Sequence, residues 1–138
     1  MNLIYLALGS NLCTPERQLR LGIKALKTLP NTSVIAVAPF YFNVAYGHKA
    51  QPNYCNTVVK ILTNLDPDLL LSLCHKIERR HGRVRRIKWG ARTLDIDIIL
   101  YAQRKIVSKN LIIPHKNYLE RDFVCIPLKH LDTQVFGA

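Results

Sequence analysis

The chain has 138 residues, of which 49% are hydrophobic and 21% charged, a composition typical of one globular domain with its own core. Its 20 Lys and Arg against 9 Asp and Glu give a formal net charge of +11, which favours an anionic partner such as a nucleotide, a nucleic acid or a membrane surface. No apolar run is long enough to cross a membrane, and the four scattered cysteines lack zinc-site spacing. We therefore expect one domain over residues 1–138, with free thiols, in a reducing cytoplasm.

The N-terminal segment predicts a strand followed by a helix. Residues 3–8 are apolar and predict a strand, after which residues 9–11 are turn formers. Thr14 and Pro15 are typical of a helix start, as N-cap and first helical residue, and Pro30 ends the helix. The turn 9–11 could bind an anion at the helix start, but it lacks the pattern of a phosphate loop, so a plain turn is the simpler interpretation.

Two further strands flank a long loop. Residues 33–42 and 54–62 are rich in β-branched and aromatic residues and predict strands. The loop between them, residues 43–53, has a length that is often functional. Tyr54 and Asn56 share one face of the second strand, where a ring and an amide could meet a ligand, although a cross-strand pair on a half-buried sheet explains them equally well.

A second helix follows these strands. Asp66 is predicted as its N-cap and Gly82 as its C-terminal stop. Its buried stripe consists of Leu70, Cys74 and Ile77. His75 and Glu78 lie three residues apart on one side of the helix, where solvated side chains are the ordinary interpretation.

The most basic stretch of the chain is the long loop 81–93 together with the helix end before it. This stretch also contains the only tryptophan, Trp89. Its cations are Arg79, Arg80, Arg83, Arg85, Arg86, Lys88 and Arg92. A run of charges is usually a solvated face, but this run leads directly into two aspartates, so that positive and acidic groups must lie close together.

Asp95 and Asp97 lie in the apolar run 94–100, which predicts a buried strand. Residues two apart in a strand point to one face, so the two carboxylates project together. Such a pair is costly beside an apolar layer unless a cation lies between the carboxylates, and hard oxygen ligands suit Mg2+ bound with substrate phosphates. An exposed acidic face on an edge strand is the alternative, but the basic run just upstream favours a metal and phosphate site.

The remaining chain predicts a turn over 102–105, a short extended piece near 106–107 and a short helical or irregular apolar segment over 124–131. The main elements thus run strand, helix, strand, strand, helix, strand. That order predicts an α+β, ferredoxin-like (βαββαβ) fold, an antiparallel sheet flanked by helices with the two long loops at the active site. The fold supports many functions and selects none.

In these motifs the chain resembles the hydroxymethyldihydropterin pyrophosphokinases of folate biosynthesis. The most specific similarity is the run Lys88 to Ile99, which contains the pattern Trp-Gly-x-Arg-Thr-Leu-Asp-x-Asp. The other matching pieces, in family order, are Leu8 to Asn11, Phe40-Tyr41, Gln51 to Tyr54 with Asn56, Ile77-Glu78, Gly82 to Arg85, Pro114-His115, and Arg121 with Phe123. Together they extend over residues 3–128.

The resemblance implies a cytoplasmic enzyme that transfers the β,γ-diphosphate of ATP to the hydroxymethyl oxygen of 6-hydroxymethyl-7,8-dihydropterin and releases AMP. ATP would be the co-substrate and two Mg2+ ions the cofactors. The partners would be these small molecules, with no nucleic acid and no membrane, and we expect a monomer. Positioning and charge neutralisation supply most of the rate in such phosphoryl chemistry.

The resemblance also implies the site residues. Catalysis would rest on Arg83, Arg92, Asp95 and Asp97, and the two aspartates would be the metal ligands. ATP would be bound by His75, Glu78, Arg83, Arg85, Lys88, Trp89, Arg92, Ile98, His115 and Arg121. The pterin would be bound by Asn43, Val44, Tyr46, Tyr54, Asn56, Trp89, Asp95 and Phe123.

Several positions depart from the family pattern. Asn43-Val44-Ala45 replaces a frequent Thr-Pro-Pro, and His75 replaces a common Gln. Lys88 stands where Arg is frequent, and a Lys cannot make the bidentate grip of an Arg on phosphate. The remaining departures, at positions of nucleotide contacts and of an aromatic residue, are Asn110, Ile112 and Lys116.

Two alternatives belong to other functional classes. A basic ferredoxin-like module could bind RNA, but no strand here carries the aromatic signature of such modules, and a carboxylate pair repels phosphate unless a metal intervenes. A non-catalytic relative could bind nucleotide as a regulator. A relative that had lost catalysis would not be expected to keep the metal and phosphate residues, and this chain retains Asp95, Asp97, Arg83, Arg92 and His115.

Overall fold

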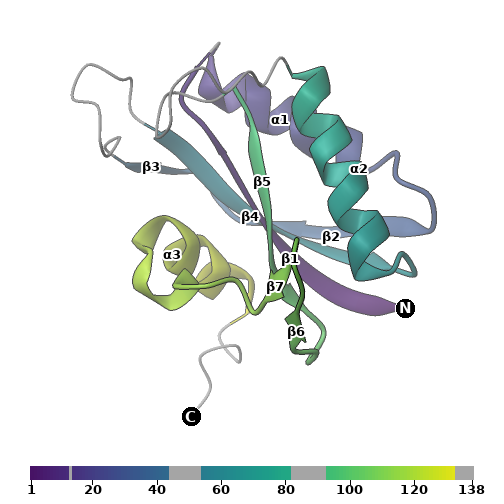
Figure 1. Cartoon of the computed structure of the whole chain (residues 1–138). Coiled ribbons are helices and arrows are strands. Elements are labelled where there is room, and N and C mark those ends of the chain that lie inside the picture. The colour runs from purple at the N-terminus through teal and green to yellow at the C-terminus, as the bar shows by residue number, and fades with distance from the viewer. Residues whose placement is uncertain (13, 44–53, 82–92, 133–138) are drawn as a thin grey trace.

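A computed structural model of the chain describes residues 1–12, 14–43, 54–81 and 93–132 (Figure 1). The main sheet contains β1 (Asn2–Ser10), β2 (Thr32–Val37), β3 (Tyr41–Asn43), β4 (Tyr54–Thr63) and β5 (Asp95–Tyr101). The strand order is β2-β4-β1-β5, neighbouring strands are antiparallel, and β3 pairs with β4 beyond the end of β2. This order confirms the predicted ferredoxin-like α+β fold.

Helices cover both faces of the sheet (Figure 1). α1 (Pro15–Leu26) and α2 (Pro67–Arg80) pack on one face, and the predicted apolar stripes of both helices are buried there. α3 (Asp122–Leu131), the segment predicted as short helical or irregular, packs on the opposite face through Val124 and Leu128. None of the helices in the described ranges combines the length and the apolarity needed to span a bilayer.

The side chains of β1 point alternately to the two faces of the sheet, one covered by α1 and α2 and the other by α3. Ile4, Leu6 and Leu8 are at most 1% exposed and belong to the core under α1 and α2, whereas Tyr5 packs with α3. Full burial of one such apolar side chain stabilises the fold by about 1.5–3 kcal/mol. β1 is therefore apolar on both faces, as predicted, because each face is covered by helix.

The predicted strand 33–42 is interrupted. β2 ends at Val37 and β3 begins at Tyr41, although both pair with β4. The amide of Ala38 still donates to the Val58 carbonyl at 3.0 Å, but Pro39 has no N–H and cannot continue the ladder. The expectation of one continuous strand was wrong at this proline.

The two predicted helix caps differ. The Asp66 carboxylate accepts a hydrogen bond from the Leu69 amide at 2.9 Å, which confirms the cap of α2. Thr14 precedes α1 as predicted, but its φ of 60° is left-handed and its side chain makes no capping bond, so its capping role was wrong. Gly82, the predicted stop of α2, lies outside the described residues; the helix ends at Arg80.

A small hairpin and a short turn of helix lead back to the sheet. β6 (Ile106–Val107) pairs with β7 (Ile112–Ile113), and the 3-10 helix η1 (Tyr118–Glu120) precedes α3. After β7, the backbone amide of His115 donates to the Ile99 carbonyl at 2.9 Å. This bond holds the His115 segment against the outer edge of β5.

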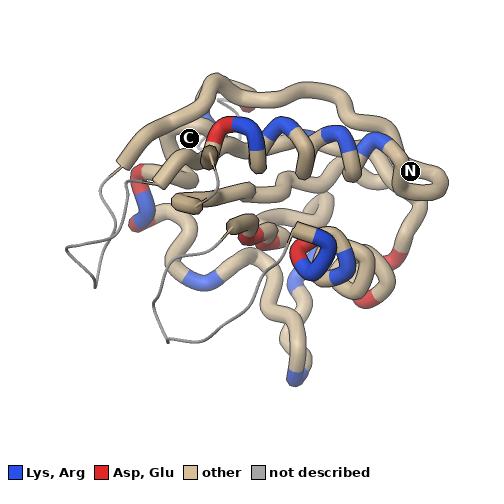
Figure 2. The backbone as a smooth tube through the Cα atoms, turned by 90° about the horizontal axis from the view of Figure 1, so that it is seen from above, with Lys and Arg blue, Asp and Glu red and all other residues tan. Residues whose placement is uncertain are grey.

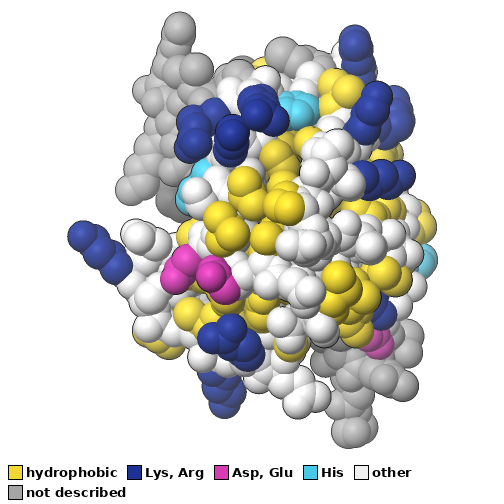
Figure 3. Space-filling model, turned by 90° about the vertical axis from the view of Figure 1, so that its right-hand side faces the viewer, with side chains coloured by type: hydrophobic (Ala, Val, Ile, Leu, Met, Phe, Trp, Pro, Cys, Tyr) yellow, Lys and Arg dark blue, Asp and Glu magenta, His cyan; other side chains and the backbone are white. Residues whose placement is uncertain are grey.

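The surface of the described part of the chain is basic. Figure 2 shows Lys and Arg recurring along α1, at the exposed residues Arg17, Arg20, Lys24 and Lys27. The face drawn in Figure 3 carries widely spread Lys and Arg side chains and few acidic ones. The positive balance of the sequence is therefore displayed over more than one face.

Candidate active site

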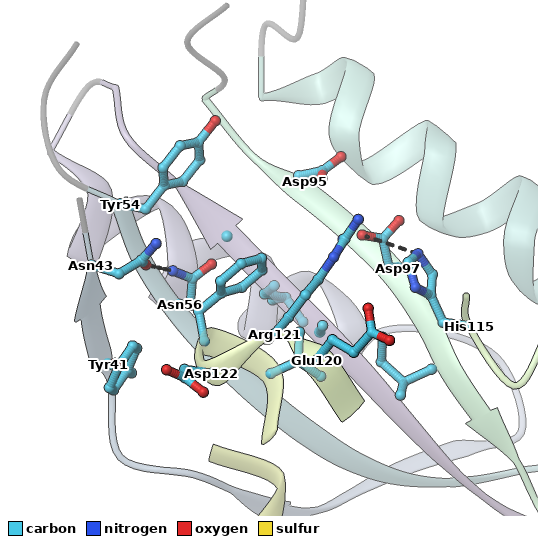
Figure 4. A pocket seen from close by; sticks show the side chains of 16 residues that line it. Tyr41, Asn43, Tyr54, Asn56, Asp95, Asp97, His115, Glu120, Arg121 and Asp122 are labelled. Carbon is cyan, nitrogen blue, oxygen red and sulfur yellow. Dashed lines mark hydrogen bonds and ion pairs between the residues drawn. The ribbon is translucent and has the colours of Figure 1, made fainter. Parts of the chain in front are cut away.

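The floor of a first cavity is formed by the α3-facing side of β4, β1 and β5. The strand register places Asp95 beside Gly9 and Asp97 beside Ala7, while Asn56 lies beside Gly9 on its other side. These residues line a cavity of about 480 Å³ in a gap that the small side chains of β1 leave open (Figure 4). The two carboxylates project from one face of the strand, as predicted.

The walls of this cavity come from β3, β4 and the start of α3. Tyr54 and Asn56 both line it, so these two residues share a face as predicted. Phe123 and Arg121 line it from the side of α3, and the Arg121 guanidinium lies 5.8 Å from the centre of the Phe123 ring. A cation over a ring face at this distance is attracted by the ring quadrupole, which stabilises the position of both side chains.

A second cavity, of about 460 Å³, lies between α2, β5 and the segment around His115. His75 and Glu78 line it from α2, and Lys109 and Lys116 line it from the other side. The residues that line both cavities are Asp95, Asp97, His115 and Arg121. The carboxylate pair therefore lies where two ligand-sized cavities meet, which is the arrangement that a transfer between two substrates requires.

His115 faces the carboxylate pair. Its Nε2 lies 4.0 Å from Asp97 Oδ2, and its Nδ1 lies 2.8 Å from the Lys116 carbonyl oxygen. Because a carbonyl oxygen only accepts, Nδ1 must carry a proton, which leaves Nε2 to face the cavity. In its doubly protonated form this imidazole is a donor and a cation, suited to a phosphate oxygen.

Glu78 is buried rather than solvated. It is 2% exposed, and its Oε2 accepts a hydrogen bond at 2.8 Å from the Ile96 amide, between the two aspartates. The ordinary interpretation of a solvated side chain was therefore wrong for Glu78, whereas His75 is exposed. Burial, with the negative charges of Glu78 and Asp97, raises the pKa of the neighbouring Cys74 thiol to about 12. Glu78 thus connects α2 to the outer edge of β5.

The other predicted site residues divide into two groups. Ile98 is 3% exposed and lines the second cavity, and Asn43 lines the first. The predicted residues Val44, Tyr46, Arg83, Arg85, Lys88, Trp89 and Arg92 lie outside the described residues. Their assignments remain predictions.

Some lining residues were not singled out from the sequence. Tyr41, Glu120 and Asp122 line the first cavity. Tyr41 belongs to the matching piece Phe40-Tyr41 of the resemblance, and Glu120 and Asp122 flank the predicted site residue Arg121. These positions were the signals in the sequence that could have identified the three residues. Gly9 was assigned to a turn, but it lies within β1, and the next two residues, Ser10 and Asn11, are fully buried. The prediction of a turn was therefore wrong for Gly9 and Ser10, which continue β1.

Comparisons with known proteins identify one family over most of the chain. The family described as 7,8-dihydro-6-hydroxymethylpterin-pyrophosphokinase matches residues 5–133. A Haemophilus influenzae 2-amino-4-hydroxy-6-hydroxymethyldihydropteridine pyrophosphokinase is 46% identical over 90% of this chain and 78% of its own length. The proteins of the same name from Pseudomonas aeruginosa and Bacillus subtilis are 41% and 38% identical, over 93% and 97% of this chain and 79% and 80% of their own lengths.

Proposed function

The chain belongs to the 7,8-dihydro-6-hydroxymethylpterin-pyrophosphokinase family, and from that premise we propose how its two cavities perform the family reaction. The enzyme transfers the β,γ-diphosphate of ATP to the hydroxymethyl oxygen of 6-hydroxymethyl-7,8-dihydropterin, releases AMP and serves folate biosynthesis. The observation that carries the proposed site is that Asp95, Asp97, His115 and Arg121 line both cavities.

The pterin occupies the first cavity in this proposal. Phe123 and Tyr54 supply aromatic surface for a flat bicyclic ring, and Asn56 supplies an amide that can read its polar edge. Asn43 is part of the same wall. We retain Val44, Tyr46 and Trp89 as pterin contacts on the resemblance alone.

ATP occupies the second cavity, with its phosphates directed toward Asp95 and Asp97. His75, Glu78 and Ile98 line this cavity beneath the nucleotide, and His115 and Arg121 lie at its junction with the first. The family residues Arg83, Arg85, Lys88, Trp89 and Arg92 would complete the phosphate contacts. The charge that develops on the transferred phosphates would be stabilised chiefly by Arg83 and Arg92.

Asp95 and Asp97 would hold Mg2+, two ions in this proposal. The donor set fits, because Mg2+ is usually bound by one or two carboxylates together with substrate phosphates and retained waters. Within the described residues, no group of three or more His, Cys, Asp and Glu could hold a metal by itself. In this proposal the substrate phosphates complete the site. A metal held by these two carboxylates would supply positive charge to neutralise the substrate phosphates.

The residues of the chain then act mainly by positioning. The cavity wall holds the hydroxymethyl oxygen in line with the bond between the β-phosphorus and the oxygen that stays with AMP. His115 in its cationic form and Arg121 balance negative charge at the junction, in a site from which the bound substrates exclude water. We further propose a cytoplasmic monomer that binds no nucleic acid or membrane.

A product assay tests the function. The protein is mixed with ATP, Mg2+ and 6-hydroxymethyl-7,8-dihydropterin, and we expect AMP and pterin diphosphate in equal amounts. ADP instead of AMP would contradict transfer from the β-phosphorus. Absence of turnover by protein with a cooperative thermal transition would contradict the activity and redirect attention to a salt-dependent RNA titration.

Two matched variants test the carboxylate pair. Asp97→Asn removes the charge without changing the shape, and we expect kcat to fall by about 10²–10³-fold with Tm unchanged. Asp68→Asn removes an exposed carboxylate on α2, outside both cavities, and should leave kcat unaltered. Equal kcat values for Asp97→Asn and the unmodified protein would contradict the proposed metal ligand.

A further inference from the structure

Asn43 and Asn56 form a side-chain pair across two strands. In the β3–β4 register Asn43 lies opposite Tyr54, and Tyr41 lies opposite Asn56, so the two asparagines are diagonal neighbours on one face. The Asn56 Nδ2 donates a hydrogen bond to Asn43 Oδ1 (Figure 4). Both residues line the cavity proposed for the pterin. Asn43, which stands where Thr is frequent in the family, therefore places a hydrogen-bonding amide beside Asn56, the residue that we expect to bind the polar edge of the pterin.

The other end of the Asn56 amide lies over the cavity floor. A Cβ built on Gly9 would be only 2.6 Å from Asn56 Oδ1, so this oxygen lies directly above the glycine backbone. Asn56 is 6% exposed, so few alternative positions are open to its side chain. Its amide thus extends from Asn43 at one end to the backbone of Gly9 at the other.

A carboxamide needs such a partner if it is to select a ligand edge. Its terminal torsion is roughly two-fold, so the donor and the acceptor exchange places when the group turns over. In the structure the hydrogen bond to Asn43 Oδ1 holds one of these orientations, and Asn56 can take the reverse orientation only if the Asn43 amide turns over as well. This hydrogen bond uses one of the two Nδ2 hydrogens and leaves the second hydrogen, together with Oδ1, for a ligand.

We propose that Asn43 is a positioning residue that determines specificity, because it orients the Asn56 amide toward the amide-like edge of the pterin. This inference rests on the proposed function and adds a role to one residue. A 2-amino-4-hydroxypteridine in its 4-oxo form presents a ring N–H beside a carbonyl oxygen. The oriented Asn56 offers the complementary acceptor and donor side by side, whereas the reversed amide faces donor with donor and acceptor with acceptor.

A double-mutant cycle distinguishes positioning from direct contact. The dissociation constant of 6-hydroxymethyl-7,8-dihydropterin is measured with saturating α,β-methylene-ATP, whose α–β bridge cannot be broken by the transfer. We expect Asn43→Ala to weaken binding about tenfold and Asn56→Ala to weaken it about 100-fold. In the Asn56→Ala background, Asn43→Ala should change the dissociation constant of the pterin by less than about twofold, because in this proposal Asn43 acts only through Asn56. Additive losses would show that Asn43 contacts the pterin itself and would overturn the proposal.

The conservative Asn43→Asp variant tests the orientation. A carboxylate can only accept, so it keeps the hydrogen bond from Asn56 Nδ2 and forbids the reverse pairing. We expect Asn43→Asp to retain the pterin affinity of the unmodified protein, whereas loss equal to that of Asn43→Ala would contradict the assigned orientation. Phe42→Ala is the control, because Phe42 lies on the same short strand, is 57% exposed and does not line the cavity.

The failure of this inference can be told from failure of the proposed function. If the unmodified protein releases AMP in a pterin-dependent way but the cycle is additive, only the role of Asn43 is wrong. If the unmodified protein neither binds nor converts the pterin, the proposed function itself is wrong. The ATP KM should stay constant throughout the series, because Asn43 and Asn56 do not line the second cavity.

Discussion

At the scale of single residues, the absence of a side chain at Gly9 shapes the site as much as any functional group. Gly9 pairs with Asn56 on one side and with Asp95 on the other. Gly9 therefore lies between Asn56 and Asp95 across the sheet. A larger residue there would fill the floor of the cavity and displace Asn56.

We predict that Gly9→Ala weakens pterin binding at least as much as Asn56→Ala. The new methyl group would meet Asn56 Oδ1 at 2.6 Å and Cγ at 3.7 Å, so the amide must move. Gly22→Ala is the control: Gly22 lines neither cavity, and its methyl group would meet flexible side-chain ends of Leu94 and Leu8, at 3.1 and 3.3 Å. Isothermal titration with the pterin would decide, and equal affinities for the Gly9→Ala variant and the unmodified protein would refute the role of this floor.

The difference between Asp95 and Gly9 illustrates what the sequence could predict about the site. The shared face of Asp95 and Asp97 follows from the local two-residue period of a strand, and it was predicted. The role of Gly9 depends on which residues of β4 and β5 lie beside it, and such register is set by contacts distant in sequence. The buried state of Glu78 was missed for the same reason, because its partner is the backbone of β5.

At the scale of elements, a part-buried hydrogen bond connects the far end of α3 to β1. The Tyr5 hydroxyl donates to Asp132 Oδ2 at 2.5 Å, directly after the last turn of α3. The first turn of the same helix carries Phe123, which lines the first cavity. The Tyr5–Asp132 bond therefore helps to set the position of a cavity wall about one helix length away. Burial and the adjacent Asp132 carboxylate raise the pKa of Tyr5 above its usual value of 10.0, so its hydroxyl remains a donor.

We predict that Tyr5→Phe lowers the free energy of unfolding by about 1.5–3 kcal/mol, the range for a hydrogen bond to a charged group. Relative to the unmodified protein, amide hydrogen exchange in Tyr5→Phe should accelerate more in α3 than in α1, and the KM for the pterin should rise. Tyr101→Phe is the control, because the Tyr101 hydroxyl donates to the Leu65 carbonyl in the core under α1 and α2. Equal exchange in α3 for both variants would contradict the proposed link.

The same contact gives a pH dependence with a definite sign. The folded-state pKa of Tyr5 is raised, so the folded protein retains a proton that the unfolded chain releases above pH 10.0. The stability contributed by this group is present below that pH and is lost as the pH rises further. Alkaline denaturation curves of the unmodified protein and of Tyr5→Phe should therefore converge above this value.

The elements themselves were predictable where a local signal determines them. The stripes of α1 and α2, the cap at Asp66 and the order of the main elements along the chain follow from periodicity and turn chemistry. The break between β2 and β3 was missed because the apolar pattern continues through Pro39 although the hydrogen bonds do not. The capping failure of Thr14 reflects its left-handed backbone, which the residue type does not indicate.

At the scale of the whole molecule, the net charge of +11 acts on one substrate and not on the other. ATP is a polyanion and dihydropterin is neutral near pH 7. A positive field over several faces attracts an anion over distances comparable to the Debye length, about 10 Å at 0.1 M salt. The field therefore favours the encounter with nucleotide.

We predict that kcat/KM for ATP falls as salt rises from about 0.05 to about 0.5 M, while kcat/KM for the pterin at saturating ATP changes little. Charge reversal of Lys24 in the last turn of α1 and of Lys27 directly after it, both exposed and outside both cavities, should reduce this salt dependence while leaving kcat constant. Steady-state kinetics over a salt series provides the measurement. Parallel salt dependences for the two substrates would show that the field does not steer ATP.

The pairing of β5 with β1 also has a consequence for insertions and deletions. Asp95 and Asp97 face the cavity because Ile96 and Ile98 face the core under α1 and α2. Deleting one residue from this part of β5 would exchange the two sets, so that carboxylates enter the apolar layer while isoleucines line the cavity. The same alternation of residues along β5 therefore determines both the active site and the core. A one-residue deletion there should destroy the site and destabilise the fold together, so that a folded but inactive protein should not accumulate.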